Sequence, residues 1–151
     1  MNFFGKAYDE IAVGDRFGQT LTIDGDHISR ACGLFGDFNP LHSDATFCAG
    51  TRFGQRILHG PMTGALMSAS LGMYFYGTAV AYLEHNCRFL APVFAGDTLT
   101  TTWTIRETLD KPRHQGGIAV LAGQCVNQRG ETVAEADGKI MLINRQAEVT
   151  A

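Results

Sequence analysis

The stretch GPMTGALMSASLGMYFYGTAVAYL, residues 60–83, carries no charged side chain, and it constrains how the rest of the chain folds. Its Gly60-Pro61 start is typical of a helix N-terminus, because proline fits the first helical position. Apolar side chains then recur at helical spacing on one face: Met62, Ala65, Leu66, Ala69 and Met73. Small or apolar side chains occupy the opposite face: Thr63, Gly64, Met67, Ser68 and Leu71. We therefore expect a helix that is buried on all sides by a sheet wrapped around it.

The same stretch has the length of a membrane span, which needs about 20 residues. Its glycines, its proline and its hydroxyl side chains leave strongly hydrophobic residues too thinly spread, and the flanks show no clear Lys/Arg asymmetry. We expect a buried helix that runs into a strand, and no membrane contact. The first 15 residues, MNFFGKAYDEIAVGD, do not resemble a secretory signal, so we predict a cytoplasmic protein.

The chain around this helix predicts one curved antiparallel sheet. Strand-like composition marks five ranges: residues 16–23, 79–90, 98–109, 118–127 and 132–144. Asp24 or Asp26 can cap a short helix that runs to about Leu34 and ends at Gly36. A central helix cradled by consecutive antiparallel strands is an α+β arrangement and describes the hot-dog architecture. Because open sheet edges and a half-covered helix gain from pairing, we expect a homodimer.

Composition supports a single domain over residues 1–151, because 45% of the residues are hydrophobic and 18% are charged. A formal net charge of −3 leaves no basic footprint for nucleic acid. The four cysteines form no C-x-x-C pair, which argues against a disulfide framework or a zinc knuckle. We expect buried, reduced thiols. We expect Trp103 to serve packing, and His27, His85 and His114 to be structural or exposed.

The run Gly36-Asp37-Phe38-Asn39-Pro40-Leu41-His42 places a carboxylate, an amide and an imidazole within six residues. Pro40 pushes Asn39 toward an extended backbone, so the chain turns and Asp37 and His42 can converge. Such a pair can hold a water between an acceptor and a group that titrates near neutrality, and Asn39 can orient either partner. The water could then add across a polarised double bond.

A second element would complete the site at Leu58-His59-Gly60-Pro61, where backbone N–H groups begin the buried helix. The helix dipole favours negative charge there, and Gly60 permits close approach of a ligand carbonyl to its N–H. A carbonyl bound at Gly60 would be stabilised as enolate charge develops. These parts together predict hydration of an α,β-unsaturated carbonyl compound.

Two other interpretations of these residues remain open. Asp37 could merely cap a turn while His42 fills a polar pocket. The second interpretation is a metal site built from Asp37, His42, Asp44 and His59, although these residues match no standard ligand spacing. We expect neither a metal nor a redox cofactor.

Four ordered blocks of the chain resemble the MaoC-like dehydratase family of hot-dog proteins, which includes R-specific enoyl-CoA hydratases. The blocks are YDEIAVGD at residues 8–15, GDFNPLHSD at 36–44, RILHG at 56–60 and RFLAPVFAGDTL at 88–99. The resemblance implies that Asp37 and His42 hold the catalytic water, that Asn39 fixes its environment and that the Gly60 N–H binds the thioester oxygen. It also implies a dimer-based assembly, with coenzyme A or acyl-carrier phosphopantetheine near the subunit interface.

The function predicted on this basis is reversible hydration of a trans-2-enoyl thioester to an (R)-3-hydroxyacyl thioester, a hydro-lyase reaction of fatty acid metabolism. One alternative is a hot-dog acyl-CoA thioesterase, in which water attacks the thioester carbonyl. Another is a non-catalytic acyl-CoA binding module, which would need no water-activating pair. Sequence alone does not assign which of Asp37 and His42 is the base.

Overall fold

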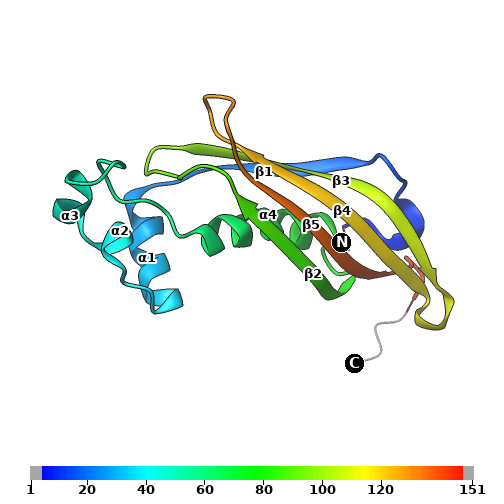
Figure 1. The fold of residues 1–151 in the computed structure, drawn as a ribbon. Coiled ribbons are helices and arrows are strands. Elements are labelled where there is room, and N and C mark those ends of the chain that lie inside the picture. Colours follow the sequence, from blue (N-terminus) through cyan, green and yellow to red (C-terminus); the bar gives the residue numbers. More distant parts are fainter. Residues whose placement is uncertain (1–4, 148–151) are drawn as a thin grey trace.

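The computed structural model describes residues 5–147 and contains one five-stranded antiparallel sheet (Figure 1). Its strands are β1 (Arg16–Thr22), β2 (Ala79–Phe89), β3 (Thr98–Lys111), β4 (Gly116–Val126) and β5 (Thr132–Ile143). Their order across the sheet is β1-β3-β4-β5-β2. The predicted α+β class and the five predicted strands are confirmed. Two predictions extend outside the described residues. The predicted single domain includes residues 1–4 and 148–151, and the prediction that the N-terminus is not a secretory signal includes residues 1–4.

The helical segments separate into a lobe and a central helix (Figure 1). The lobe holds α1 (Gly25–Phe35), α2 (Pro40–Ser43) and α3 (Ala45–Ala49), and it extends beyond the end of the sheet. The central helix, α4 (Gly60–Tyr74), lies against one face of the sheet. Two short 3₁₀ turns, η1 (Tyr8–Glu10) and η2 (Pro112–His114), complete the described structure. None of the helices within residues 5–147 is long and apolar enough to cross a membrane.

The boundaries of α1 follow from its capping residues. The Asp24 carboxylate accepts a hydrogen bond from the His27 N–H at 2.9 Å, which satisfies one of the free donors of the first turn. At the other end Gly36 has φ of 69°, a left-handed conformation that glycine adopts without steric cost. The prediction for this helix is confirmed, and Gly36 turns the chain directly into Asp37.

Helix α4 packs against the sheet with the face opposite the apolar face of Met62, Ala65 and Met73. The buried positions are Thr63, Gly64, Met67, Ser70 and Leu71. Ala65 and Ala69 are exposed, and Met73 is 66% exposed. Small side chains let the helix approach the strands closely, so the sheet takes the small face and leaves the Met73 face uncovered. The prediction that this helix is buried on all sides is therefore wrong for the single chain.

Trp103 anchors the core between α4 and the sheet, as predicted. Its side chain is fully buried, and its indole N–H donates to the Met67 carbonyl at 2.9 Å. A Cβ at Gly123 on the neighbouring strand would lie 2.7 Å from the indole, so only glycine fits opposite the ring. The four cysteines are free thiols, of which Cys87 alone is only partly buried.

One edge of the sheet is unusually apolar. Five large hydrophobic side chains on or directly after β2 are between 43% and 55% exposed: Val80, Tyr82, Leu83, Phe89 and Leu90. Strand β2 pairs only with β5 within the described residues, so its other side presents unpaired backbone groups. The exposed β2 edge and the uncovered face of α4 together form an apolar surface of the kind that marks protein–protein contacts.

Candidate active site

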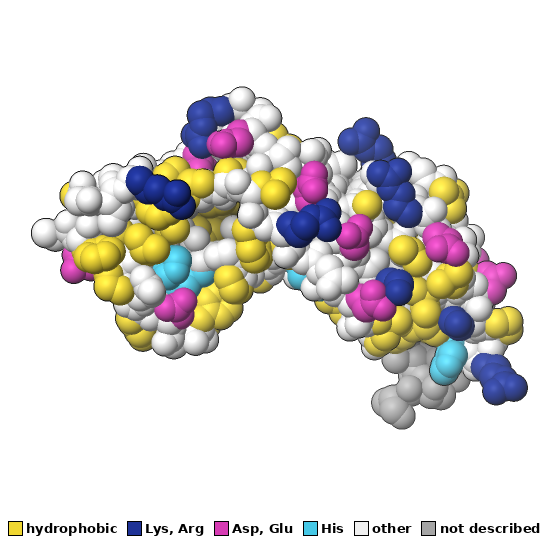
Figure 2. All heavy atoms as spheres, viewed as in Figure 1, with side chains coloured by type: hydrophobic (Ala, Val, Ile, Leu, Met, Phe, Trp, Pro, Cys, Tyr) yellow, Lys and Arg dark blue, Asp and Glu magenta, His cyan; other side chains and the backbone are white. Residues whose placement is uncertain are grey.

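Asp37 and His42 are brought together by the turn between α1 and α2. Asn39 has φ of −48° and ψ of 134°, the extended conformation imposed by Pro40, and Pro40 then begins α2. The turn places Asp37 Oδ2 3.9 Å from His42 Nε2. In Figure 2 a histidine and an acidic side chain lie together on the lobe, where the surface is hollowed between lobe and sheet.

The segment that leads into α4 fixes the orientation of the His42 ring. The Ile57 N–H donates to the Leu41 carbonyl at 3.0 Å, and the Ile57 carbonyl lies 2.8 Å from His42 Nδ1. Since a carbonyl only accepts, Nδ1 carries the proton and Nε2 of the neutral ring is an acceptor. The His42 side chain is 14% exposed and the Asp37 side chain 54%, so the pair opens to solvent on the Asp37 side.

The separation of this pair suits a bridging water. At 3.9 Å, Oδ2 and Nε2 are too far apart for a direct hydrogen bond. A water oxygen about 2.8 Å from each atom closes the triangle with an angle of roughly 90°. Both protein atoms are acceptors, so the water would donate both of its protons to them. Its lone pairs then point away from the pair, which is the orientation that a nucleophilic water needs.

Asn39 acts on this pair through its backbone. Its N–H donates to Asp37 Oδ1 at 3.0 Å, which holds the carboxylate and leaves Oδ2 directed at His42. Its side-chain oxygen accepts from the Leu41 N–H at 3.1 Å and thereby caps α2. Asn39 therefore holds the Asp37 carboxylate through its backbone N–H, and its carboxamide oxygen stabilises the turn.

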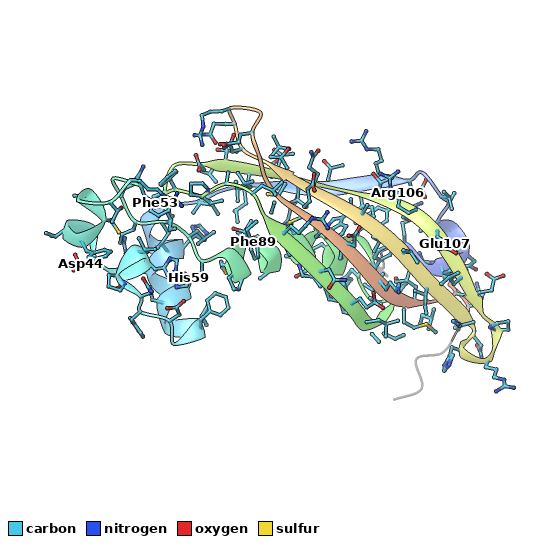
Figure 3. All side chains as sticks on the ribbon, in the orientation of Figure 1. Asp44, Phe53, His59, Phe89, Arg106 and Glu107 are labelled. Atoms are coloured by element: carbon cyan, nitrogen blue, oxygen red, sulfur yellow. The ribbon has the colours of Figure 1, made fainter. Side chains whose placement is uncertain are left out.

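From the sequence, the His59 side chain is a candidate only as a metal ligand. It is 2% exposed, its Nε2 lies 2.9 Å from the Asp37 carbonyl oxygen, and its ring stacks on His42 at 3.7 Å between centroids. Figure 3 shows it inside the lobe, at the entry to α4. No local pattern in the sequence signals these contacts, because they join His59 to residues that are 22 and 17 positions away.

Gly60 begins α4, and its N–H has no hydrogen-bond partner among residues 5–147. A Cβ at this position would lie 3.0 Å from the ring of Phe89. A groove of about 270 Å³ runs past this point, and it is lined in part by Phe53, Gly60, Thr63, Phe89 and Leu90. Figure 3 shows Phe53 on the lobe and Phe89 at the end of β2, where the sheet approaches the lobe. Gly60, whose N–H is free, therefore contributes to the wall of a partly apolar groove.

The remaining sequence candidates separate from this group. Asp44 caps α3 by accepting from the Phe47 N–H at 2.9 Å, and it lies at the outer end of the lobe in Figure 3. His27 Nδ1 accepts from the Asp24 N–H at the start of α1, His114 is exposed, and half-buried His85 pairs with the Tyr82 hydroxyl at 2.5 Å. Burial lowers the pKa of His85, and a contact with the Gly64 backbone only partly opposes this. The prediction that these three histidines are structural or exposed is confirmed.

Asp37, His42 and His59 form the one cluster with possible metal ligands within the described part of the chain, their candidate ligand atoms lying within 4.8 Å of one another. A tetrahedral zinc site brings neighbouring ligand atoms to about 3.3 Å, which is closer than the 3.9 Å between Asp37 and His42. His59 Nε2 is also committed to the Asp37 carbonyl. The donor set therefore fits a water better than it fits a metal ion.

Comparison with known proteins identifies the family. The model of the MaoC-like domain matches residues 12–141, which include every residue of the cluster and all but the last two residues of β5. The chain belongs to the MaoC-like dehydratase family.

Members of this family with assigned activities are similar over most of the chain. An (R)-specific enoyl-CoA hydratase of Aeromonas caviae is 34% identical over 118 residues, which is 76% of this chain and 83% of that protein. The unliganded R-hydratase PhaJ1 of Pseudomonas aeruginosa superimposes with a TM-score of 0.82 at 32% identity, over 96% of this chain and 94% of that chain. A 3-hydroxybutyryl-CoA dehydratase of Methylorubrum extorquens is 38% identical over 80 residues, covering 53% of this chain and 51% of that protein. The structural match confirms the hot-dog fold.

Proposed function

We propose that this MaoC-like protein is an (R)-specific enoyl-CoA hydratase, which adds water reversibly to a trans-2-enoyl thioester to give an (R)-3-hydroxyacyl thioester. The observation that carries the proposal is the convergence of Asp37 Oδ2 and His42 Nε2, at 3.9 Å, on the volume of one water. The names of the similar hydratases support the substrate class and the R configuration.

In the proposed reaction the water oxygen bonds to C3 of the substrate while one water proton passes to the Asp37–His42 pair. The C2–C3 π electrons move toward the thioester carbonyl, and a proton from the pair then bonds to C2. Proton count and charge balance over the cycle, so no oxidant or reductant is required. General acid–base catalysis of this kind contributes about 10²–10⁴ in rate. Asn39 keeps the carboxylate in place throughout.

Gly60 would supply the electrostatic part of the mechanism. Its free N–H at the N-terminus of α4 can donate to the thioester oxygen, where negative charge accumulates once C3 is attacked. The 15-residue helix behind it adds its dipole in the same direction. A preorganised donor of this kind stabilises the enolate more than the substrate, which is the requirement for lowering the barrier.

We further propose that the active form is a homodimer joined along β2. The five exposed apolar side chains of that edge and the uncovered face of α4 would be buried together, and two β2 strands could pair their free backbone groups. The carrier, coenzyme A or an acyl-carrier phosphopantetheine, would lie near this interface. We propose a cytoplasmic location for a single domain spanning residues 1–151, with no nucleic-acid or membrane partner.

The experiment that tests this function supplies crotonyl-CoA and follows two signals at once. Hydration lowers the ultraviolet absorbance of the conjugated enoyl thioester and releases no thiol. A thioesterase would release free coenzyme A, from saturated acyl-CoA as well. A binding module would change neither signal while still retaining the ligand in a titration. Loss of absorbance without thiol is the expected result, and either of the other two patterns overturns the proposal.

A further inference from the structure

His59 contacts both members of the proposed water-binding pair, each in a different way. Its Nε2 lies 2.9 Å from the backbone carbonyl oxygen of Asp37, which makes Nε2 the donor because a carbonyl only accepts. Its ring stacks on His42 with 3.7 Å between centroids and 23° between planes. One side chain thus touches the backbone that carries the carboxylate and the ring that carries Nε2.

The other nitrogen of His59 has no function in the fold. Nδ1 is buried and has no hydrogen-bond partner among the described residues. With the proton on Nε2, Nδ1 is an unpaired acceptor in the neutral ring, and burying such a group is unfavourable. Phe35 packs near the same ring at 5.5 Å, so an apolar ring would fit these surroundings without an unpaired nitrogen. Packing alone therefore does not explain an imidazole at this position.

We infer that His59 is a positioning residue for the hydration reaction. Its hydrogen bond holds the Asp37 backbone, its stacked ring limits rotation of His42, and together they fix the 3.9 Å spacing that accommodates the water. The inference rests on the proposed function for its kinetic consequences, although the geometric claim stands separately. The Arg56 guanidinium also contacts this cluster, because it donates to the His42 carbonyl at 3.3 Å.

The two contacts can be removed separately. His59→Phe keeps a stacking ring and removes both the donor and the unpaired nitrogen. His59→Gln keeps an amide N–H that can reach the Asp37 carbonyl and removes the ring. We expect His59→Phe to lower kcat by about tenfold or more, because small displacements of catalytic groups are costly. KM should stay within about threefold, because His59 does not line the groove beside Gly60. The melting temperature should change little, because loss of the hydrogen bond to the Asp37 carbonyl is offset by removal of the buried unpaired nitrogen.

The conservative variant tests which contact matters. His59→Gln should recover part of the lost kcat, to at least about threefold above His59→Phe, since it restores the donor to Asp37. A purely structural His59 predicts the reverse pattern, with a lower melting temperature and kcat within about twofold of the parent. That pattern in His59→Phe overturns the inference.

A nuclear magnetic resonance measurement separates this inference from the proposed function. Long-range proton–nitrogen correlation spectra report which nitrogen of each histidine carries the proton. In the parent, His42 should show a single Nδ1–H tautomer, as its contact with Ile57 requires. In His59→Gln, which removes the stacked ring, that signal should broaden or show mixed tautomers, whereas His59→Phe should keep the parent signal. An unchanged His42 signal in both variants contradicts the positioning claim, and it does so even if the parent protein fails to hydrate crotonyl-CoA.

Discussion

Replacing Asp37 by asparagine reverses the polarity of one side of the water site without changing its shape. Asn39 N–H donates to Oδ1 at 3.0 Å, so the new amide keeps its oxygen there and directs its NH₂ group at His42 Nε2, 3.9 Å away. The water then meets a donor and an acceptor in place of two acceptors, and the carboxylate no longer takes up a proton. His42 still accepts, so we place the loss of kcat at the lower end of general acid–base effects, about 10²-fold.

The fold should tolerate this change. The Asp37 side chain is 54% exposed and keeps its bond to the Asn39 N–H, so we expect the free energy of unfolding to change by no more than about 0.5 kcal/mol. Crotonyl-CoA hydration and thermal unfolding are measured side by side. Asp44→Asn is the matched control, because it makes the same substitution at the α3 cap and should leave kcat near the parent value. A folded Asp37→Asn protein with kcat within about threefold of the parent would refute the reasoning.

Four further outcomes follow from the same structure. His42→Gln should lower kcat by at least about 10²-fold while unfolding stays near that of the parent, and a folded, active variant would contradict the paired mechanism. Treatment with a metal chelator should leave turnover unchanged, whereas loss of activity that zinc restores would assign a metal to the Asp37–His42 cluster. Leu83→Arg, at an exposed position of the apolar β2 edge, should shift the mass in light scattering from a dimer toward one chain of 16.4 kDa; a parent that is already monomeric would rule out the dimer. Burial opposes ionisation of Asp97, but the Phe94 N–H, Gln128 and Arg129 outweigh it and hold the pKa of Asp97 below its ordinary value. The stabilisation is therefore present above the ordinary pKa of about 3.9 and is lost as pH falls through the lower folded-state pKa. Asp97→Asn should therefore lose less stability in acid than the parent does. Parallel plots of unfolding free energy against pH for the two proteins would argue against this assignment.

Local signals were enough to predict the helices and strands near the site and the convergence of Asp37 and His42. Gly36 and Asp24 bound α1 because each has a conformational or hydrogen-bonding preference that acts within a few residues. Pro40 likewise dictates the turn that brings Asp37 to His42. The helix caps and the turn depend only on residues close in sequence, so tertiary packing does not alter them.

Tertiary packing decided what the sequence could not. The apolar periodicity of α4 indicates two nearly equivalent faces, and only the close approach of the sheet to Gly64 selects one of them. The role of His59 is hidden for a related reason. Its contacts with Asp37 and His42 join residues that are 22 and 17 positions away, and no local pattern reports such a contact.

The most direct test of the account is to let the protein act on crotonyl-CoA in heavy-oxygen water and locate the label by mass spectrometry. Hydration places the heavy oxygen on C3 of a hydroxyacyl thioester that still carries coenzyme A, and chiral analysis of that product should give the R isomer. The account predicts this result for the parent and a loss of label incorporation in Asp37→Asn. Label in a free carboxylate, or no label in either product, would contradict it.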